Sequence, residues 1–241
     1  MTVRCEVDGD GTTITVAVTG QLRLADAPRL RDRLLKCLAE QPEALLVDLS
    51  GLHVDQPLAL AVLISVQRQA TRWPGTPVLF CGPPPPTWTH LRTSAFSQLP
   101  LFVNLAAARE HLRDERRTLP SVCEDLLPVS GSSRHARDVV TDTCLRWDLP
   151  DLVAPASLIV TELVANVIDH AHTMMTLRLS LRTRHLNIAV QDGSGRQPQT
   201  GPAAEPDGVS GRGLLLVDSV ADSWGWLPCE DGKVVWASLR R

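Results

Sequence analysis

The chain has very little lysine and no excess of basic charge. Of its 241 residues, 24 are Lys or Arg and 27 are Asp or Glu, which gives a net charge of -3. Lysine occurs only at Lys36 and Lys233, a scarcity that we attribute to codon bias in a GC-rich genome. A protein that binds nucleic acid is expected to present a basic surface. The composition therefore gives no support for direct binding to nucleic acid.

Features of exported and membrane proteins are also scarce. No apolar run approaches the roughly 20 residues that span a bilayer, and the start, Met1 to Glu6, lacks the basic-then-apolar pattern of a signal peptide. The six cysteines are scattered without Cys-x-x-Cys spacing, so buried free thiols fit better than a metal site or a disulfide framework. We expect a cytoplasmic protein without membrane contact, long enough for one large or two small domains.

The first half alternates strand and helix patterns. This alternation predicts a compact α/β domain. The run from Pro83 to Pro86 is expected to be a stiff loop, because proline disrupts helix interiors and central strands. From periodicity and apolar runs, strands are expected at 12–18, 44–49 and 78–80, and helices at 25–38, 58–70 and 105–113.

The second half follows a charged, Pro-interrupted linker at 114–120. It is expected to open with a helix. The stretch 196–210 is rich in Pro, Gly and Gln and shows no periodicity, which indicates a mobile loop. Helices are expected at 133–145, from about 154 onward and at 213–221, and strands at 175–180, 186–191 and 234–239, the first two joined by a turn at 182–185.

A carboxylate and a carboxamide lie four positions apart in an apolar, helix-favouring run. Glu162 and Asn166 should therefore project from one face of a helix. Such a pair suits a hard cation and the proton of an attacking hydroxyl. Taken alone, the pair fits two exposed helix residues better than a site.

Two further motifs follow in order along the chain. Asp192-Gly193-Ser194-Gly195 contains an Asp-Gly turn, and Gly211-Arg212-Gly213-Leu214 precedes a helix. Each has a plain alternative, since Asp-Gly often only joins strands and glycine often only starts or ends an element. The acid-plus-amide helix, the turn and the Gly-x-Gly helix start, in this order, describe a nucleotide pocket.

Residues 122–241 resemble the histidine-kinase-type ATPase domain of the gyrase, chaperone, histidine kinase and mismatch-repair (GHKL) superfamily. Within it, they are most similar to bacterial anti-sigma factors that are also serine kinases. The resemblance implies a GHKL (Bergerat) ATPase α/β sandwich. The matching motifs are Ala136-Arg137, Glu162-Leu163-Val164-x-Asn166, His170-Ala171, Asp192, Gly211-Arg212-Gly213-Leu214, Trp224-Gly225 and Gly232-Lys233-Val234-Val235-Trp236-Ala237.

The resemblance implies roles for the acidic and amide residues. Asn166 would supply its side-chain oxygen to Mg²⁺, which bridges the phosphates of ATP. Glu162 would accept the proton of the attacking serine hydroxyl or water. Asp192 would accept a hydrogen bond from the adenine amino group. For His170, on the same helix face, a structural hydrogen bond is favoured over catalysis.

The resemblance also implies roles for the glycine-rich motifs. Gly193 and Gly195 would let the backbone pass close to the base. Gly211 and Gly213, with Arg212 and Leu214 in the same motif, would bring backbone N–H groups and a helix N-terminus to the phosphates. The loop 196–210 would be a lid. One departure is that Ser194 and Arg196 occupy the usual glycine places of the second motif, where a side chain would narrow the pocket.

Residues 1–113 are similar to the sulfate-transporter and anti-sigma antagonist (STAS) domain, the small α/β module of anti-anti-sigma factors. The similarity rests on Gly20-x-Leu22-x-Leu24, the 27–38 helix, Val47-Asp48-Leu49-Ser50-Gly51-Leu52 and Asp55. In the antagonists a helix begins with Asp-Ser-Ser-Gly and its second serine is phosphorylated, whereas here Pro57 lacks a hydroxyl. Ser50 and Ser65 are nearby but do not match that place. This half is therefore a fixed docking module, an internal occupant of the kinase face, or a decayed fusion partner kept for stability.

The combined expectation is a partner-switching regulator. It would bind ATP and Mg²⁺ and, as an anti-sigma-type serine/threonine protein kinase, phosphorylate an antagonist protein and so control transcription. A catalytically weak, nucleotide-gated protein that sequesters a sigma factor or antagonist is the alternative, and a scaffold without nucleotide is a third. The expected partners are a STAS antagonist or a sigma factor, and the resemblance makes a homodimer possible.

Overall fold

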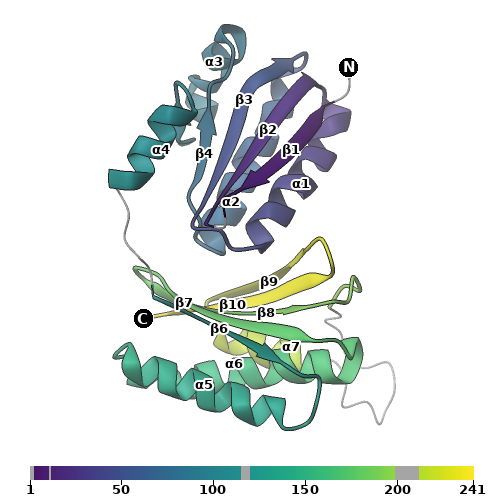
Figure 1. Ribbon diagram of the computed structural model, residues 1–241, viewed down its shortest axis with the longest axis vertical. Coiled ribbons are helices and arrows are strands. Elements are labelled where there is room, and N and C mark those ends of the chain that lie inside the picture. The colour runs from purple at the N-terminus through teal and green to yellow at the C-terminus, as the bar shows by residue number, and fades with distance from the viewer. Residues whose placement is uncertain (1–2, 11, 115–119, 199–211) are drawn as a thin grey trace. The chain divides into compact units, whose positions relative to one another are not determined.

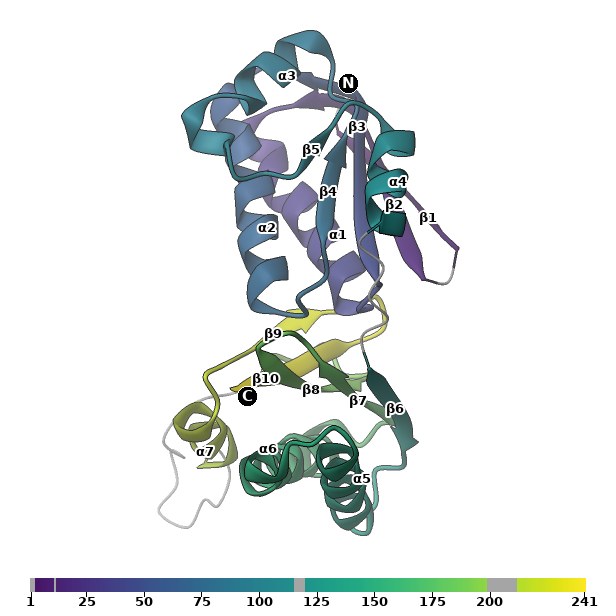
Figure 2. The same ribbon diagram turned by 90° about the vertical axis from the view of Figure 1, so that its left-hand side faces the viewer.

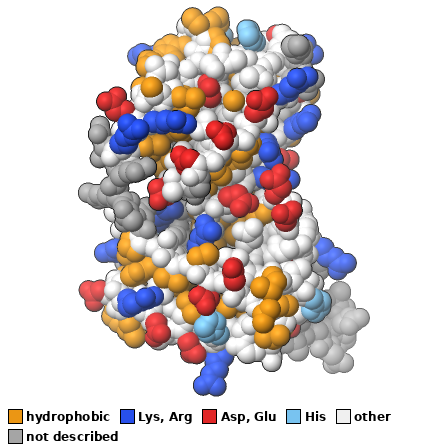
Figure 3. Space-filling model, in the orientation of Figure 1, with side chains coloured by type: hydrophobic (Ala, Val, Ile, Leu, Met, Phe, Trp, Pro, Cys, Tyr) orange, Lys and Arg blue, Asp and Glu red, His pale blue; other side chains and the backbone are white. Residues whose placement is uncertain are grey.

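The computed structural model divides into two compact units, Met1–Arg117 and Thr118–Arg241, each with its own sheet (Figure 1). Figure 3 shows acidic and basic side chains interspersed over the visible face of both units, as the small net charge leads one to expect. The residues described are 3–10, 12–114, 120–198 and 212–241.

The first unit is an α/β domain around a five-stranded sheet. The strands, in sheet order, are β1 Arg4–Gly9, β2 Thr13–Leu22, β3 Ala44–Val54, β4 Val78–Cys81 and β5 Leu101–Phe102. The helices are η1 Leu24–Asp26, α1 Ala27–Ala39, η2 Pro57–Leu60, α2 Ala61–Arg72, α3 Pro85–Leu91, η3 Ser94–Phe96 and α4 Leu105–Asp114. β1 is antiparallel to β2 and the other neighbours are parallel. Parallel strands need crossover connections, and here α1 and α2 cover one sheet face and α4 the other (Figure 2).

The apolar stripe predicted for the first helix is confirmed. Leu30, Leu34 and Leu38 recur every four residues on α1, and each is at most 1% exposed. Residues at this spacing share one helix face. The alternating strands and helices predicted for this half are likewise present, with β3 extending five residues past its expected end because its pairing with β2 continues to Val54.

Two features of the first unit differ from expectation. The proline run was expected to be a loop throughout, but Pro85 and Pro86 are the first residues of α3. Proline is tolerated in the first helical turn, where its missing N–H has no intrahelical partner. The sheet also gains β1 and β5. β1 is mostly exposed, so it lacks the alternation that marks a half-buried strand, and β5 is too short to show any pattern.

The second unit pairs an antiparallel sheet with a layer of helices. The strands, in the sheet order β6-β7-β8-β10-β9, are β6 Ser121–Leu126, β7 Met175–Leu181, β8 His185–Asp192, β10 Lys233–Arg240 and β9 Ser223–Pro228. The helices are α5 Ser132–Arg146, η4 Pro150–Leu152, α6 Val153–Asn166, the π-helical turn η5 Val167–Ala171 and α7 Arg212–Val220. In Figure 2, α5, α6 and α7 lie on one face of this sheet.

The hairpin predicted between β7 and β8 is confirmed. The two strands pair antiparallel, and the N–H of Arg182 donates to the carbonyl oxygen of His185 at 2.8 Å to close the turn. The expectation that this half opens with a helix is wrong, because β6 precedes α5 and pairs with β7. β9 was also missed. The predicted loop 196–210 falls mainly on 199–211, outside the described residues.

The central helix of the second unit is unusually apolar. The stretch Pro150–Ala171, which joins η4, α6 and η5, is long and apolar enough by length and composition to cross a membrane, contrary to the sequence expectation. Its apolar side chains are used in the domain core, where α6 packs against α5, α7, β8 and β10. The buried residues of α6 are Ala156, Ile159, Val160, Leu163 and Val164. We therefore interpret this stretch as a core helix, on whose remaining surface Glu162 and Asn166 lie.

Candidate functional site

The predicted acid-plus-amide pair lies on one helix face. Glu162 and Asn166 are four residues apart on α6 and both are partly exposed, whereas Leu163 and Val164 between them are buried. Asn166 is the last residue of α6, and the π-helical turn η5 follows directly. Such turns widen the helix and often occur at functional sites.

The start of α7 approaches the acidic residue of this pair. A Cβ added to Gly213 would lie 2.5 Å from Oε2 of Glu162, so a side chain at this position would force the Glu162 carboxylate to move. The structure thus brings together Glu162 and Gly213, which are 51 positions apart in the sequence. Gly211 and the side chain of Arg212 lie outside the described residues. Leu214 does not face the site, because its side chain is buried in the domain core.

Asp192 is a buried carboxylate with two unequal oxygens. It is the last residue of β8, and its side chain has no exposed surface. Oδ1 accepts hydrogen bonds from the N–H of Ser194 at 2.7 Å and from Nζ of Lys233 at 2.9 Å. Oδ2 is also buried but has no hydrogen-bond partner among the described residues. Buried carboxylate oxygens are normally satisfied, so this atom calls for a donor that the described part of the chain does not supply.

The glycines after Asp192 occupy different surroundings. Gly193 donates its N–H to Oγ1 of Thr173 at 2.9 Å, and an added Cβ would press on that side chain at 3.3 Å. A Cβ at Gly195 would meet nothing within 4 Å. Ser194, in a place where the family usually has glycine, is partly exposed and gives its backbone N–H to Asp192. The side chain of Thr173 therefore leaves little room for a side chain at Gly193, whereas the space beside Gly195 is open.

The sequence identifies Lys233 as part of a family motif but predicts no role for it. On β10 it stands directly opposite Asp192 in the strand register, and its side chain is 6% exposed. The pairing depends on the register of two strands that are separated in sequence by α7 and β9, so sequence spacing alone does not reveal it. His170, for which a structural role was favoured, is exposed on η5.

These residues fit the ATP and Mg²⁺ implied by the family resemblance. The unpaired Oδ2 of Asp192 suits an amino donor, and the partly exposed oxygens of Glu162 and Asn166 suit a cation and a proton. No group of three or more His, Cys, Asp or Glu side chains capable of holding a metal is found within the described ranges. A magnesium ion would thus depend on phosphate oxygens for most of its ligands, as it commonly does in nucleotide sites.

Pro57 stands where the family resemblance leads one to expect the phosphorylated serine of the antagonists, and it has no hydroxyl. Pro57 begins η2. Just before it, Asp55 accepts hydrogen bonds from the side chains of Gln21 and Arg23, the latter at 3.1 Å. Leu58, the next residue, is 76% exposed. The segment before η2 is thus held by the hydrogen bonds of Asp55, and the exposed side chain of Leu58 lies next to it in the sequence.

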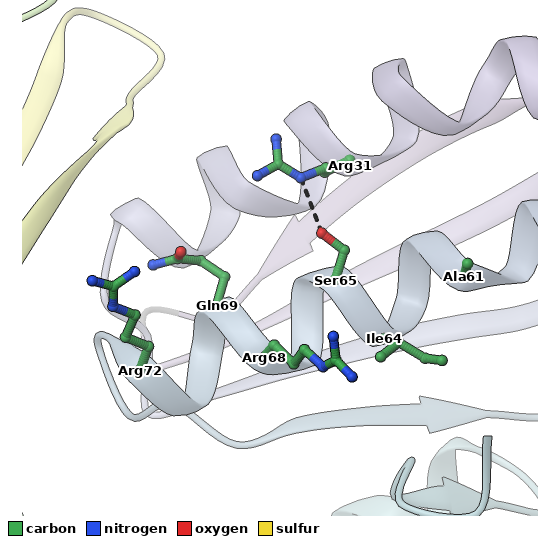
Figure 4. Close-up of a pocket in the computed structure, with 7 residues that line it drawn as sticks. All are labelled: Arg31, Ala61, Ile64, Ser65, Arg68, Gln69 and Arg72. Carbon is green, nitrogen blue, oxygen red and sulfur yellow. Dashed lines mark hydrogen bonds between the residues drawn. The ribbon is translucent and has the colours of Figure 1, made fainter. Parts of the chain in front are cut away.

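A basic hollow of about 430 Å³ lies between α1 and α2 of the first unit (Figure 4). Nε of Arg31 donates to Oγ of Ser65 at 3.1 Å across it. Its three arginines are exposed, so the hollow is open to solvent. The lining residues are Arg31, Ala61, Ile64, Ser65, Arg68, Gln69 and Arg72.

Several solved structures are similar to the first half of the chain. One is an anti-sigma factor antagonist from Mycobacterium paratuberculosis, with 23% identity, a TM-score of 0.42, and coverage of 47% of this chain and 96% of that chain. Another is the unphosphorylated anti-sigma factor antagonist SpoIIAA, with 9% identity, a TM-score of 0.40, and coverage of 47% and 100%. A variant of RsbS from Moorella thermoacetica has 20% identity, a TM-score of 0.39, and coverage of 46% and 96%.

Family models match both halves, whereas no curated protein matches the chain. Residues 5–104 match the model described as "Mlab, STAS domain". Residues 130–239 match the model described as "Histidine kinase-like ATPase domain", and this range contains Glu162, Asn166, Asp192 and Lys233. The chain therefore consists of an N-terminal STAS domain followed by a C-terminal domain of the histidine kinase-like ATPase family.

Proposed function

We propose that this chain is an ATP-dependent partner-switching regulator that phosphorylates a serine or threonine of a separate antagonist protein. The observation that carries the proposal is the buried, unpaired Oδ2 of Asp192. A buried acceptor without a donor is unfavourable by about 1–3 kcal/mol. The amino group of a bound adenine would donate the missing hydrogen bond to Oδ2. The Asp192 carboxylate would in this way recognise the adenine base.

The phosphate end of the nucleotide would lie near the start of α7. Gly213 allows close approach there, and backbone N–H groups at a helix N-terminus favour negative charge. Glu162 touches this position and Asn166 lies one turn further along α6. Because α6 also packs against β8, which ends at Asp192, the base-reading and phosphate-binding residues belong to one packed unit.

The proposed chemistry is transfer of the γ-phosphoryl group. Mg²⁺, held by the side-chain oxygen of Asn166, would neutralise the phosphates. Glu162 would take the proton of the attacking serine or threonine hydroxyl. The oxygen of that hydroxyl would form the new bond to the γ-phosphorus. The bond between that phosphorus and the β,γ-bridging oxygen then breaks, which leaves ADP and a phosphorylated acceptor.

The STAS domain supports a separate protein as the acceptor. A STAS domain joined to a histidine kinase-like ATPase domain fits partner-switching regulation. Pro57 offers no hydroxyl at the site where the antagonists are phosphorylated, so this domain would dock or present partners and would not accept phosphate there. The proposed partners are an antagonist of the STAS class or a sigma factor, in the cytoplasm.

The proposal is tested by phosphoryl transfer to candidate antagonists. The full chain and a Glu162→Ala variant are each mixed with labelled ATP, Mg²⁺ and the antagonist, and labelled antagonist is measured over time. Asp169→Ala is the matched control, because Asp169 is an exposed acid on the adjoining π-helical turn. We expect the Glu162 variant to be slower by about a hundredfold or more and the control to match the natural chain. Equal rates for natural chain and Glu162→Ala would refute the kinase assignment.

A second function is favoured by the replaced glycines. Ser194 and Arg196 carry side chains where the family pattern has glycine, which fits a protein that binds ATP and sequesters a sigma factor or antagonist without turnover. Tight ATP binding together with no transfer and no hydrolysis selects this alternative over the kinase.

A further inference from the structure

Lys233 carries a buried charge that the proposed reaction does not use. Its side chain is 6% exposed, and its Nζ donates to Oδ1 of Asp192 at 2.9 Å and to the carbonyl oxygen of Ser194 at 3.2 Å. Removing an ammonium group from water is strongly unfavourable unless it is paired and hydrogen-bonded. The ammonium group of Lys233 is paired with Asp192, the residue that we propose to bind the adenine base.

The strand register and a glycine fix the position of this lysine. Lys233 pairs with Asp192 across β10 and β8, and the residues two positions along, Val235 and Val190, are buried in the same core. The lysine and aspartate therefore share the helix-facing side of the sheet. Gly232 just before it has a φ of +154°, and a Cβ there would lie 1.9 Å from the carbonyl oxygen of Asp192. Position 232 therefore accommodates no residue larger than glycine without a shift of the backbone next to Asp192.

The consequence is a carboxylate with a single free oxygen. Oδ1 of Asp192 already receives two donors, Nζ of Lys233 and the N–H of Ser194, whereas Oδ2 receives none within the described part of the chain. A free carboxylate can bind two parallel donors with its two oxygens. Oδ2 is thus the one acceptor atom of Asp192 left for a ligand, and because it is buried here, the site must open for a ligand to reach it.

We propose that Lys233 is a specificity-determining positioning residue that makes this site select adenine over guanine. The inference rests on the proposed nucleotide binding. Adenine presents one amino group next to a ring nitrogen that accepts, so a single carboxylate oxygen serves it. Guanine presents two adjacent donors, N1–H and the 2-amino group, which are best bound by both oxygens of one carboxylate. By occupying Oδ1, Lys233 removes the second acceptor that guanine needs.

A purely structural ion pair would behave differently. Loss of such a pair would weaken the binding of every nucleotide to a similar degree, because the whole site would loosen. A specificity role changes the ratio of the affinities for two bases. The ratio is therefore the measurement that separates the two readings.

The test is calorimetric titration of the full chain with ATP, GTP and purine riboside triphosphate, which lacks the 6-amino group, all with Mg²⁺. For the natural chain we expect GTP and the 6-desamino nucleotide to bind about tenfold or more weakly than ATP, as for the loss of one charge-assisted hydrogen bond. In Lys233→Met the ATP-to-GTP preference should fall at least about tenfold. Lys36→Met, which changes the only other lysine, is the control and should leave all three affinities unchanged.

A second variant keeps the test decisive if Lys233→Met does not fold. Lys233→Arg keeps the charge, but a guanidinium forms two parallel hydrogen bonds to a carboxylate and would engage Oδ2 as well. We expect its ATP affinity to lose the dependence on the 6-amino group. An unchanged ATP-to-GTP ratio in folded Lys233→Met, or an unchanged 6-amino dependence in Lys233→Arg, overturns the inference while leaving ATP binding intact. A natural chain that binds no nucleotide overturns the proposed function, and this inference with it.

Discussion

At the scale of single residues, the approach of Gly213 to Glu162 gives a direct prediction. In Gly213→Ala the new Cβ would displace Oε2 of Glu162, the end of a flexible side chain, so stability should change by no more than about 0.5 kcal/mol. Moving Glu162, the proposed general base, should slow phosphoryl transfer by about tenfold to a hundredfold. Gly131→Ala is the control, since its Cβ would meet nothing within 4 Å and Gly131 has no part in the proposed site. Equal transfer rates in both variants would show that the position of Glu162 is unimportant.

The cysteines give a prediction for thiol reactivity. Burial, and secondarily the nearby charge of Asp48, raises the pKa of Cys81 to about 12, and burial also raises the pKa of Cys144. The thiolate is the reactive form, so at pH 8 a thiol reagent should modify exposed Cys123 first and partly buried Cys5, whose pKa burial also raises, more slowly. Adding urea should release the buried thiols for reaction. Rapid labelling of Cys81 in the folded chain would contradict its burial.

The same shift sets the sign of a pH effect on stability. The folded pKa of Cys81 lies above its ordinary value of 9.0, so its burial supports the folded state fully below about pH 9. As the pH rises from there toward 12, the unfolded chain loses the proton first and this support is lost. Urea denaturation midpoints measured at pH 8 and pH 10.5 should therefore show a lower value at the higher pH. A Cys81→Ser variant should lose part of that difference.

Local spacing was enough to nominate some site residues and not others. Glu162 and Asn166 could be predicted because their spacing of four places both on one helix face. Lys233 could not, because its partner Asp192 lies 41 positions away and the two meet only through strand register. Leu214 shares a motif with Gly213 but points into the core, since neighbouring helix positions face different directions.

At the scale of elements, the β9–β10 pair depends on a glycine. Gly225 on β9 is paired with Trp236 on β10, and a Cβ at Gly225 would lie 2.8 Å from Cζ2 of that ring. Gly225→Ala should therefore lower the free energy of unfolding by about 1–3 kcal/mol, as overpacking does. Chemical denaturation measures the change. Gly131→Ala, whose Cβ would meet nothing within 4 Å, is the control, and an equal effect in both would contradict the proposed clash.

The elements that sequence predicted were those with strong periodicity. α1 carries a leucine stripe and β7 and β8 alternate, so their types followed from pattern alone. The sequence of β6, Ser-Val-Cys-Glu-Asp-Leu, does not alternate regularly between apolar and polar residues, and its strand character comes from pairing with β7. The start of α3 at Pro85 shows the opposite error, in which a residue that ends helices elsewhere begins one.

At the scale of the whole molecule, the chain combines two domains, each with its own sheet and its own buried core. The STAS domain has no hydroxyl at Pro57, and the ATPase domain holds all the residues proposed to bind nucleotide. The order of the two domains was readable from sequence because their motifs keep order and spacing.

The most direct measurement is a calorimetric titration of the full chain with ATP, with and without Mg²⁺, beside Asn166→Ala. We expect that the natural chain binds ATP and that Mg²⁺ strengthens this binding. Asn166→Ala should lose about tenfold or more of the affinity in the presence of Mg²⁺ and little in its absence. The absence of ATP binding by the natural chain, or identical Mg²⁺ dependence in the variant, would contradict a magnesium-nucleotide site on this helix.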